Sequence, residues 1–245
     1  MNQMHPETET PATPGPVRAV LFDLDGTLID TESQTDRAIA AVARRHGVVR
    51  FTLPPAQTRG VRWIEVAETM RRTTAIAQSA EALAGELIDE WLVSVRDAPG
   101  LPGASEACIA AAASGLRLAV VSSSPRSVID HFVEKLGISG FVASEARIGA
   151  DSVRHGKPHP EGFLLGASAV GASPGQCLVF EDSRAGLLAA RAAGMRSMFI
   201  TCCADEIEEK RQLATGMLTD YRRLPPGFWN ALMSGTATIA GADFS

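Results

Sequence analysis

Four short apolar runs, each followed by polar residues and then by a helical pattern, constrain the fold of this chain more than any other feature. The runs are Val17–Phe22, Leu116–Val121, Cys177–Phe180 and Met198–Thr201. Apolar segments of this length suit buried strands, and strands that alternate with helices form parallel βαβ units. The sequence therefore predicts an α/β protein built on an open parallel sheet.

Capping residues predict where two of the intervening helices begin and end. After the second run, Ser124 is expected to cap a helix that starts at Pro125 and ends near Gly137. After the third run, a helix is expected over 184–193 and is expected to stop at Gly194. Both helices then begin just beyond the carboxyl end of a predicted strand.

The segment 31–99 breaks the alternation, because its apolar residues follow only helical spacing. The positions that define this spacing are Ile39, Val42, Ala43, Trp63, Val66, Ala67, Met70, Leu83, Leu87, Trp91 and Val95. We expect a helical unit over 31–99, inserted into an α/β core formed by residues 17–30 and 100–245. No strand is predicted inside it.

Composition excludes several classes of function. The net charge of -5 argues against a nucleic-acid-binding face, and no apolar run approaches the ~18 residues of a membrane span. Residues 1–16 lack the pattern of a signal peptide and are expected to form a disordered tail. The four cysteines have no metal-site or disulfide spacing, and Cys108 and Cys177 are expected in the core. A cytoplasmic location fits these features best, and no required protein partner is evident.

Polar residues follow the predicted strands at the points where ligands bind in open parallel sheets. Asp23 and Asp25 follow the first run, Ser122 follows the second, and Glu181–Asp182 follow the third, while Lys157 precedes another helix. Carboxylates two residues apart lie on the same side of an extended chain, where they repel each other unless a cation or proton relieves them. A serine alone is more often a helix cap, and a lysine alone is more often a surface residue. Their order along the chain indicates a shared site.

The motifs Asp23-Leu24-Asp25-Gly26-Thr27, Ser122, Gly156-Lys157-Pro158 and Glu181-Asp182 resemble those of the haloacid dehalogenase-like superfamily of phosphohydrolases. The resemblance runs from Val17 to about Thr201. The helical unit between the first two motifs is similar to the cap of the β-phosphoglucomutase and phosphoglycolate phosphatase branch. This resemblance implies a Rossmann-like, doubly wound parallel sheet with a small inserted α-helical cap.

The resemblance also implies roles for the acidic residues. Asp23 would be the nucleophile that forms an aspartyl-phosphate, and Asp25 would be the general acid and base. Mg²⁺ would be bound by the carboxylates of Asp23 and Asp182 and by the backbone carbonyl of Asp25. Glu181 would hold the metal through water or directly.

The remaining site residues would bind substrate. Ser122 and the amides behind it, including that of Ser123, suit phosphate oxygens, and Lys157 would neutralise charge shared by the phosphoryl group and Asp23. The cap loop before the second cap helix contains Arg59 and Arg62, either of which could bind a carboxylate or sugar hydroxyls; a solvated arginine at a helix start is the alternative. His155 and His159 flank Lys157 and are interpreted as loop residues rather than metal ligands.

The same residues discriminate between reactions known for this resemblance. Asp25 and Asp182 argue against a dehalogenase, and the absence of lysine from 31–99 argues against a phosphonatase. A β-phosphoglucomutase-type mutase carries a cap histidine where this chain has Thr35, and His46 lies too far along the helix to replace it. A non-catalytic phosphate-binding module would have lost Asp23 or Asp25. The sequence thus predicts a Mg²⁺-dependent phosphatase of a small phosphorylated metabolite, such as a sugar phosphate, a phosphosugar acid or phosphoglycolate.

Overall fold

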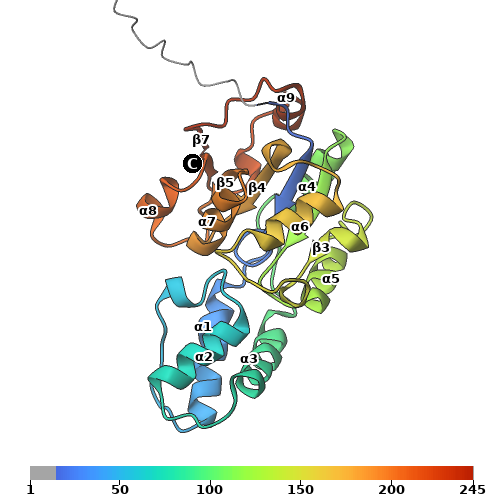
Figure 1. Ribbon diagram of the computed structural model, residues 1–245. Helices are drawn as coiled ribbons and strands as arrows, with labels where there is room; N and C mark the ends of the chain where they lie inside the picture. The colour runs from blue at the N-terminus through green and yellow to red at the C-terminus, as the bar shows by residue number, and fades with distance from the viewer. Residues whose placement is uncertain (1–14, 245) are drawn as a thin grey trace, which may run out of the picture.

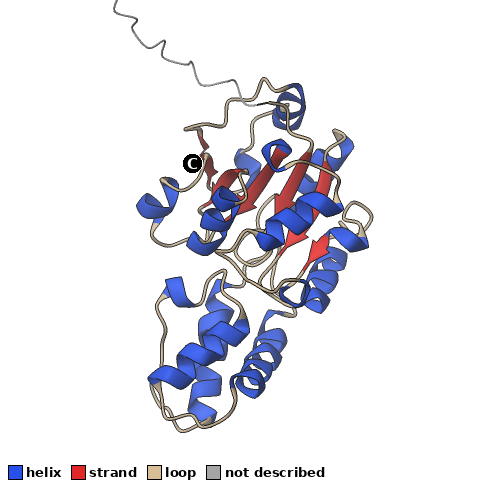
Figure 2. Cartoon of the chain, viewed as in Figure 1, coloured by secondary structure: helices blue, strands red, loops and turns tan. Residues whose placement is uncertain are grey.

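The computed structural model describes residues 15–244 of the chain, which contain one sheet of seven parallel strands in the order β3-β2-β1-β4-β5-β6-β7 (Figures 1 and 2). The strands are β1 (Ala19–Phe22), β2 (Arg117–Val121), β3 (Arg147–Ile148), β4 (Cys177–Glu181), β5 (Arg196–Ile200), β6 (Gly216–Leu218) and β7 (Asp243–Phe244). The predicted parallel α/β sheet is confirmed. The sequence did not predict β3, β6 and β7, because two or three residues are too few to show a strand pattern.

Helices cover both faces of this sheet. They are α4 (Ala104–Ala113), α5 (Arg126–Lys135), α6 (Glu161–Ala169) and α7 (Arg184–Ala192), with α8 (Ile207–Arg211) and α9 (Phe228–Ser234) nearer the C-terminus. Short 3₁₀ turns lie at Pro55–Gln57, Ser144–Ala146, Ala150–Ser152, Pro174–Gln176 and Tyr221–Arg223. In Figure 1, α6 and α7 lie across the near face of the sheet. The connections that contain α4 and α5 run along the sheet in the direction opposite to those that contain α6 and α7. Because parallel crossovers are right-handed, α4 and α5 therefore lie on the face of the sheet opposite to α6 and α7.

The segment between β1 and α4 folds into three helices, α1 (Glu32–Arg45), α2 (Trp63–Thr73) and α3 (Ala80–Val95), below the sheet in Figure 1. All of its predicted apolar positions are buried, and the rings of Trp63 and Trp91 lie 5.7 Å apart. The two ends of the segment meet, because Ile29 forms an antiparallel bridge with Gly100. The amide of Leu101 also donates to the carbonyl of Leu28 at 2.9 Å.

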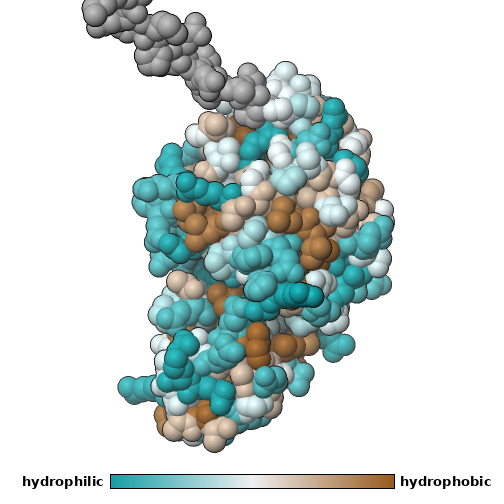
Figure 3. All heavy atoms as spheres, in the orientation of Figure 1, coloured by the Kyte–Doolittle hydropathy of each residue, from teal (hydrophilic) through white to brown (hydrophobic). Residues whose placement is uncertain are grey.

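Most buried apolar residues form one large cluster, and a second, smaller one is formed by Leu187, Phe199 and Met217. Phe22 and Phe180, on adjacent strands, stack with ring centroids 5.2 Å apart, and Cys108 and Cys177 are buried free thiols as expected. Burying an aromatic side chain of this kind stabilises the fold by about 1.5–3 kcal/mol. On the face shown in Figure 3, hydrophilic residues cover most of the surface and hydrophobic ones form small groups. No helix within residues 15–244 is both long and apolar enough to span a membrane.

The helix termini differ from the sequence prediction by one residue at the start of α5 and at the end of α7. Helix α5 begins at Arg126 and Pro125 is its cap residue, so the predicted capping role of Ser124 is wrong. Ser183 does cap α7, since its hydroxyl accepts a hydrogen bond from the amide of Gly186 at 3.0 Å. Of the predicted tail 1–16, residues 1–14 lie outside the described residues, while the carbonyl of Gly15 accepts a hydrogen bond from Arg196 at 2.9 Å.

Candidate active site

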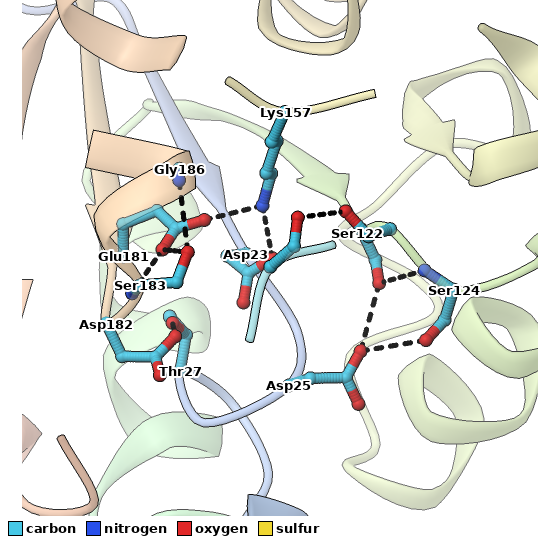
Figure 4. Close-up of polar contacts among 12 residues, drawn as sticks. Asp23, Asp25, Thr27, Ser122, Ser124, Lys157, Glu181, Asp182, Ser183 and Gly186 are labelled. Atoms are coloured by element: carbon cyan, nitrogen blue, oxygen red, sulfur yellow. Dashed lines mark hydrogen bonds and ion pairs between the residues drawn. The ribbon is translucent and has the colours of Figure 1, made fainter. Parts of the chain in front are cut away.

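The carboxyl ends of β1, β2 and β4 bring the predicted motif residues together (Figure 4). Asp23 directly follows β1, Ser122 follows β2, and Asp182 follows β4, whose last residue is Glu181. The amide of Asp23 donates to the carbonyl of Phe180 at 3.0 Å, which fixes the first motif against β4. The chain can then turn sharply because Gly26 adopts a φ of 78°, a conformation that glycine tolerates.

Lys157 joins two of the carboxylates at the centre of the site. Its Nζ lies 2.5 Å from Oδ1 of Asp23 and 2.5 Å from Oε1 of Glu181, and all three side chains are buried. Burial favours the neutral amine, but the two carboxylates outweigh it and raise the pKa of Lys157 above its usual value. Lys157 is therefore a permanent cation beside Asp23. The sequence indicated its proximity to Asp23 but not its contact with Glu181.

The second oxygen of Glu181 is also occupied. Oε2 accepts hydrogen bonds from the amide of Ser183 at 2.7 Å and from the hydroxyl of Ser183 at 2.9 Å. Both Glu181 oxygens thus have partners within the protein, and the carboxylate is fixed in one orientation. This arrangement suits a residue that holds a metal through water better than one that binds it directly.

Three buried carboxylates, Asp23, Glu181 and Asp182, place one oxygen each within 4.8 Å of one another. Thr27 donates to Oδ1 of Asp182 at 3.2 Å. Burial is the largest influence on Asp23 and raises its pKa well above the usual value, and the neighbouring carboxylates Glu181 and Asp25 raise it further, against the opposing effect of Lys157. One ammonium cannot balance three carboxylates in a buried site. An all-oxygen donor set with excess negative charge fits a hard divalent cation such as Mg²⁺.

Asp25 is turned toward three hydroxyl groups and not toward Lys157. Its Oδ2 accepts hydrogen bonds from Ser122 at 3.1 Å and Ser124 at 2.9 Å, and its Oδ1 accepts one from Thr31 at 3.1 Å. Loss of contact with water raises the pKa of Asp25, and the three hydrogen bonds oppose the rise. A carboxyl group with a raised pKa can exist in the protonated form and give up its proton. The sequence did not identify Ser124 and Thr31, because isolated hydroxyl residues carry no signal of their partner.

The helices α1–α3 close the site from below. A cavity of about 40 Å³ separates them from the strand ends, lined by Asp23, Asp25, Thr35, Thr58, Arg59, Gly60, Val61, Trp63, Trp91, Ser123 and Ser124. Ser123 donates through its hydroxyl to the carbonyl of Gly60 at 2.7 Å, so it contacts the helical segment. Thr35 lies on the cavity wall, where its hydroxyl accepts a hydrogen bond from the indole of Trp91 at 3.2 Å.

The two arginines of the 58–62 loop occupy different places. Arg59 lines the cavity that holds Asp23 and Asp25, and its Nη1 lies 3.2 Å from Oδ2 of Asp205. Arg62 does not line that cavity. Its Nε donates to Glu65 at 2.9 Å and its Nη1 donates to the carbonyl of Arg154 at 3.1 Å. Arg59 thus shares a cavity with the two aspartates, whereas Arg62 lines a neighbouring cavity with Ser122, Ser123 and Lys157.

Comparison with known proteins identifies the family. The family model of haloacid dehalogenase-like hydrolases matches residues 17–194, which is more than half of the chain. The chain belongs to this family. The predicted family resemblance is confirmed, and the matched range covers every motif residue described above.

Relatives in the haloacid dehalogenase-like family include named phosphatases. The chain is 33% identical to the validoxylamine A 7′-phosphate phosphatase of Streptomyces hygroscopicus subsp. limoneus, over 77% of this chain and 87% of that protein. It is 32% identical to the phosphoglycolate phosphatase of Salmonella typhimurium, over 76% of this chain and 81% of that protein. The crystal structure of β-phosphoglucomutase from Clostridium difficile has the same fold, with a TM-score of 0.72, 21% identity, and coverage of 89% of this chain and 97% of that one. The prediction of a phosphatase of this family is confirmed.

Proposed function

We propose that this protein is a Mg²⁺-dependent phosphatase that hydrolyses a small phosphorylated metabolite through an aspartyl-phosphate on Asp23. The observation that carries the proposal is the contact of the Lys157 ammonium with Asp23, beside Glu181 and Asp182. A dianionic phosphate that approaches a carboxylate meets strong repulsion, about 4 kcal/mol for two unit charges 4 Å apart at an effective dielectric constant of 20. Lys157 and a bound cation would offset this repulsion.

In the first step, a carboxylate oxygen of Asp23 attacks phosphorus, and the bond between phosphorus and the leaving alcohol breaks. Protonated Asp25 gives its proton to the departing oxygen, which the raised pKa of this carboxyl group favours. Ser122 supplies a hydroxyl beside Asp25 for the phosphate oxygens. Lys157 holds Oδ1 of Asp23, which leaves Oδ2 as the attacking atom.

In the second step, Asp25 acts as a base. Its carboxylate takes a proton from water as that water attacks phosphorus, and the acyl-phosphate bond breaks to return Asp23 as a carboxylate. Hydrogen bonds from Ser124 and Thr31 would keep Asp25 in position in both steps, while the Ser122 hydroxyl turns from Asp25 to the phosphate. Asp23, Asp182 and the backbone carbonyl of Asp25 would hold Mg²⁺, with Glu181 acting through water, and the ion would supply charge neutralisation to the phosphoryl group when bound.

We propose that residues 31–99 act as a cap that selects the substrate. The cavity at Asp23 and Asp25 has a volume of about 40 Å³, and a second cavity of about 200 Å³ shares Arg59 and Val61 with it and is also lined by Lys157. Arg59 lines both cavities and would bind a carboxylate or hydroxyls of the leaving group. Sugar phosphates, phosphosugar acids and phosphoglycolate remain the candidate substrates, in a cytoplasmic enzyme that needs no protein partner.

The decisive experiment measures release of inorganic phosphate from a panel of phosphorylated metabolites, ranked by kcat/KM, with Mg²⁺ and with EDTA. Trapping of ³²P on the wild type, and its absence from Asp23→Asn, would support the aspartyl-phosphate. Glu145→Gln, at an exposed position of the 3₁₀ turn Ser144–Ala146, serves as the matched control and should behave as wild type. Phosphate release that persists in EDTA, or labelling that persists in Asp23→Asn, would overturn the proposal.

The mutase alternative is tested with β-glucose 1-phosphate and a bisphosphate primer. A mutase must keep water from its phosphoenzyme, and the threonine hydroxyl at position 35, which accepts a hydrogen bond from Trp91, cannot act as a base near neutral pH. We expect free phosphate to form faster than glucose 6-phosphate. The reverse order would favour the mutase.

A further inference from the structure

A second group of potential metal ligands lies on the surface loop that precedes α6. His155, His159 and Glu161 place one ligand atom each within 4.8 Å of one another. Nδ1 of His155 lies 3.1 Å from Oε2 of Glu161, and Nδ1 of His159 lies 3.9 Å from the same oxygen. The two histidines are exposed loop residues, as the sequence indicated, but the fold also joins them to a carboxylate.

The spacing of these atoms is close to what a tetrahedral ion requires. Ligand atoms at about 2.0–2.1 Å from Zn²⁺ are separated from one another by about 3.3 Å in a tetrahedron. The 3.1 Å between His155 Nδ1 and Glu161 Oε2 is close to this value, and the 3.9 Å between His159 Nδ1 and the same oxygen is longer. The imidazole ring centroids lie 4.7 Å apart with an angle of 39° between the ring planes, so the two rings are direct neighbours. Small side-chain rotations are enough to complete the geometry.

The backbone around the group is already constrained. Pro158 and Pro160 flank His159 and fix their own φ angles. The carboxylate of Glu161 accepts hydrogen bonds from the amides of Arg154 and His155, each at 3.0 Å. The hydrogen bond from the Arg154 amide has the largest effect, and together with that from His155 it lowers the pKa of Glu161 to about 2. The carboxylate is therefore an anion at neutral pH. The anionic ligand is thus held in place without a metal.

We propose that His155, His159 and Glu161 bind a divalent transition-metal ion such as Zn²⁺, with the remaining position open to water. Two imidazoles and one carboxylate suit ions of this class, whereas the oxygen-only cluster at Asp23, Glu181 and Asp182 suits Mg²⁺. Binding through Nδ1 of His155 would require the neutral tautomer whose single ring proton lies on Nε2, and the ion would take the place of the hydrogen bond between Nδ1 and Glu161. The amide of Glu161, 3.3 Å from Nδ1 of His159, would exchange that long hydrogen bond for water.

The proposed ion would bridge both sides of the turn that carries Lys157. His155 precedes Lys157 by two residues and His159 follows it by two, while the Lys157 ammonium reaches inward to Asp23. The carbonyl of Arg154, next to this group, accepts a hydrogen bond from Arg62 of the helical segment. An ion here would stiffen the turn from outside without touching the buried carboxylates.

The test titrates Co²⁺, a spectroscopic substitute for Zn²⁺, into the full-length protein with Mg²⁺ saturating. Visible absorbance of a low-symmetry Co²⁺ site should appear with one equivalent bound. His155→Ala and His159→Ala should each weaken this binding about tenfold or more. Both side chains are more than half exposed, at 65% and 51%, so the variants should fold.

Two matched variants make the outcome decisive. His131→Ala removes an exposed histidine of α5 and should leave Co²⁺ binding unchanged. Asp182→Asn should lose phosphatase activity yet retain the Co²⁺ signal, so the inference does not depend on the proposed function. Equal binding by wild type and the His155→Ala/His159→Ala double variant would overturn the proposal, as would loss of the signal in Asp182→Asn.

Discussion

Replacing Lys157 with methionine should destabilise the fold more than any other single change at the strand ends. Its ammonium contacts Asp23 and Glu181 at 2.5 Å each, and the side chain is only 7% exposed. Methionine is similar in length, but it removes the ammonium that lies 5.1 Å from the centre of the Phe163 ring and leaves two buried carboxylates without their cation. Removal of one partner from a buried ion pair costs about 3–5 kcal/mol of unfolding free energy. That is a large fraction of the roughly 5–15 kcal/mol that stabilises a typical domain.

The destabilisation of Lys157→Met should depend on pH with a defined sign. Burial raises the pKa of Asp23 in the folded state, and the ammonium that opposes this rise is absent from the variant. The folded variant then binds more protons than its unfolded chain, so its stability falls as pH increases. Because Lys157 holds the pKa of Asp23 lower in the wild type than in the variant, the difference in unfolding free energy between the two proteins should be larger at high pH than at low pH.

Urea unfolding in EDTA at several pH values measures this effect, since EDTA removes any cation that could replace the ammonium. Lys135→Met, at an exposed lysine on α5, is the matched control and should change stability by no more than about 0.5 kcal/mol. The double variant Lys157→Met/Glu181→Gln should recover part of the loss, because one of the two unpaired charges is removed. A loss below about 1 kcal/mol at pH 8, or one that does not shrink on acidification, would refute the reasoning.

Four further outcomes are expected. Asp23→Asn should lower kcat by about 10³-fold or more while circular dichroism shows an intact fold, and activity within tenfold of wild type would exclude Asp23 as the nucleophile. Ser124→Ala removes a hydrogen bond that favours the charged form of Asp25, so the alkaline limb of the pH profile of kcat/KM should move to higher pH; an unmoved limb would contradict this. EDTA should stop turnover, Mg²⁺ should restore it, and Ca²⁺ should inhibit because it favours a looser oxygen shell, so full activity in chelator would exclude the metal requirement. Arg59→Ala should raise KM for the best substrate at least about tenfold, the loss expected for a desolvated charged hydrogen bond, whereas Arg62→Ala should have a smaller effect; equal effects would reject the assignment.

Much of this site was predictable because its chemistry lies in contiguous motifs at strand ends. Asp23 and Asp25 follow a recognisable buried strand, and the carboxyl ends of parallel strands meet at one edge of the sheet. The hydroxyl partners were not predictable: Ser124 could equally cap α5, and its bond to Asp25 is visible only once β1 and β2 are paired. The outcome for the two arginines was not predictable either.

Arg59 and Arg62 illustrate the limit, because a three-residue separation inside a loop fixes no direction for a side chain. Arg62 pairs with Glu65 three residues on, which is a local spacing, whereas Arg59 pairs with the distant Asp205, which no local pattern encodes. The same limit applies to β3, β6 and β7, which pair at the two sides of the sheet with two or three residues each. Such short strands form because a neighbouring strand offers backbone partners, and so they are a product of tertiary structure.

The bridge between Ile29 and Gly100 has a consequence for how the specificity of this protein can change. The chain leaves and re-enters the core at one point, so an insertion between these two residues affects the sheet no more than a surface loop would. The entropic free-energy cost of closing such a loop rises by only about 0.6 kcal/mol for each doubling of its length. A different helical unit can therefore be spliced in at this junction while Asp23 and Lys157 keep their partners on the strand ends. Substrate specificity can therefore evolve through the inserted segment while the strand-end residues that react with the phosphoryl group stay unchanged.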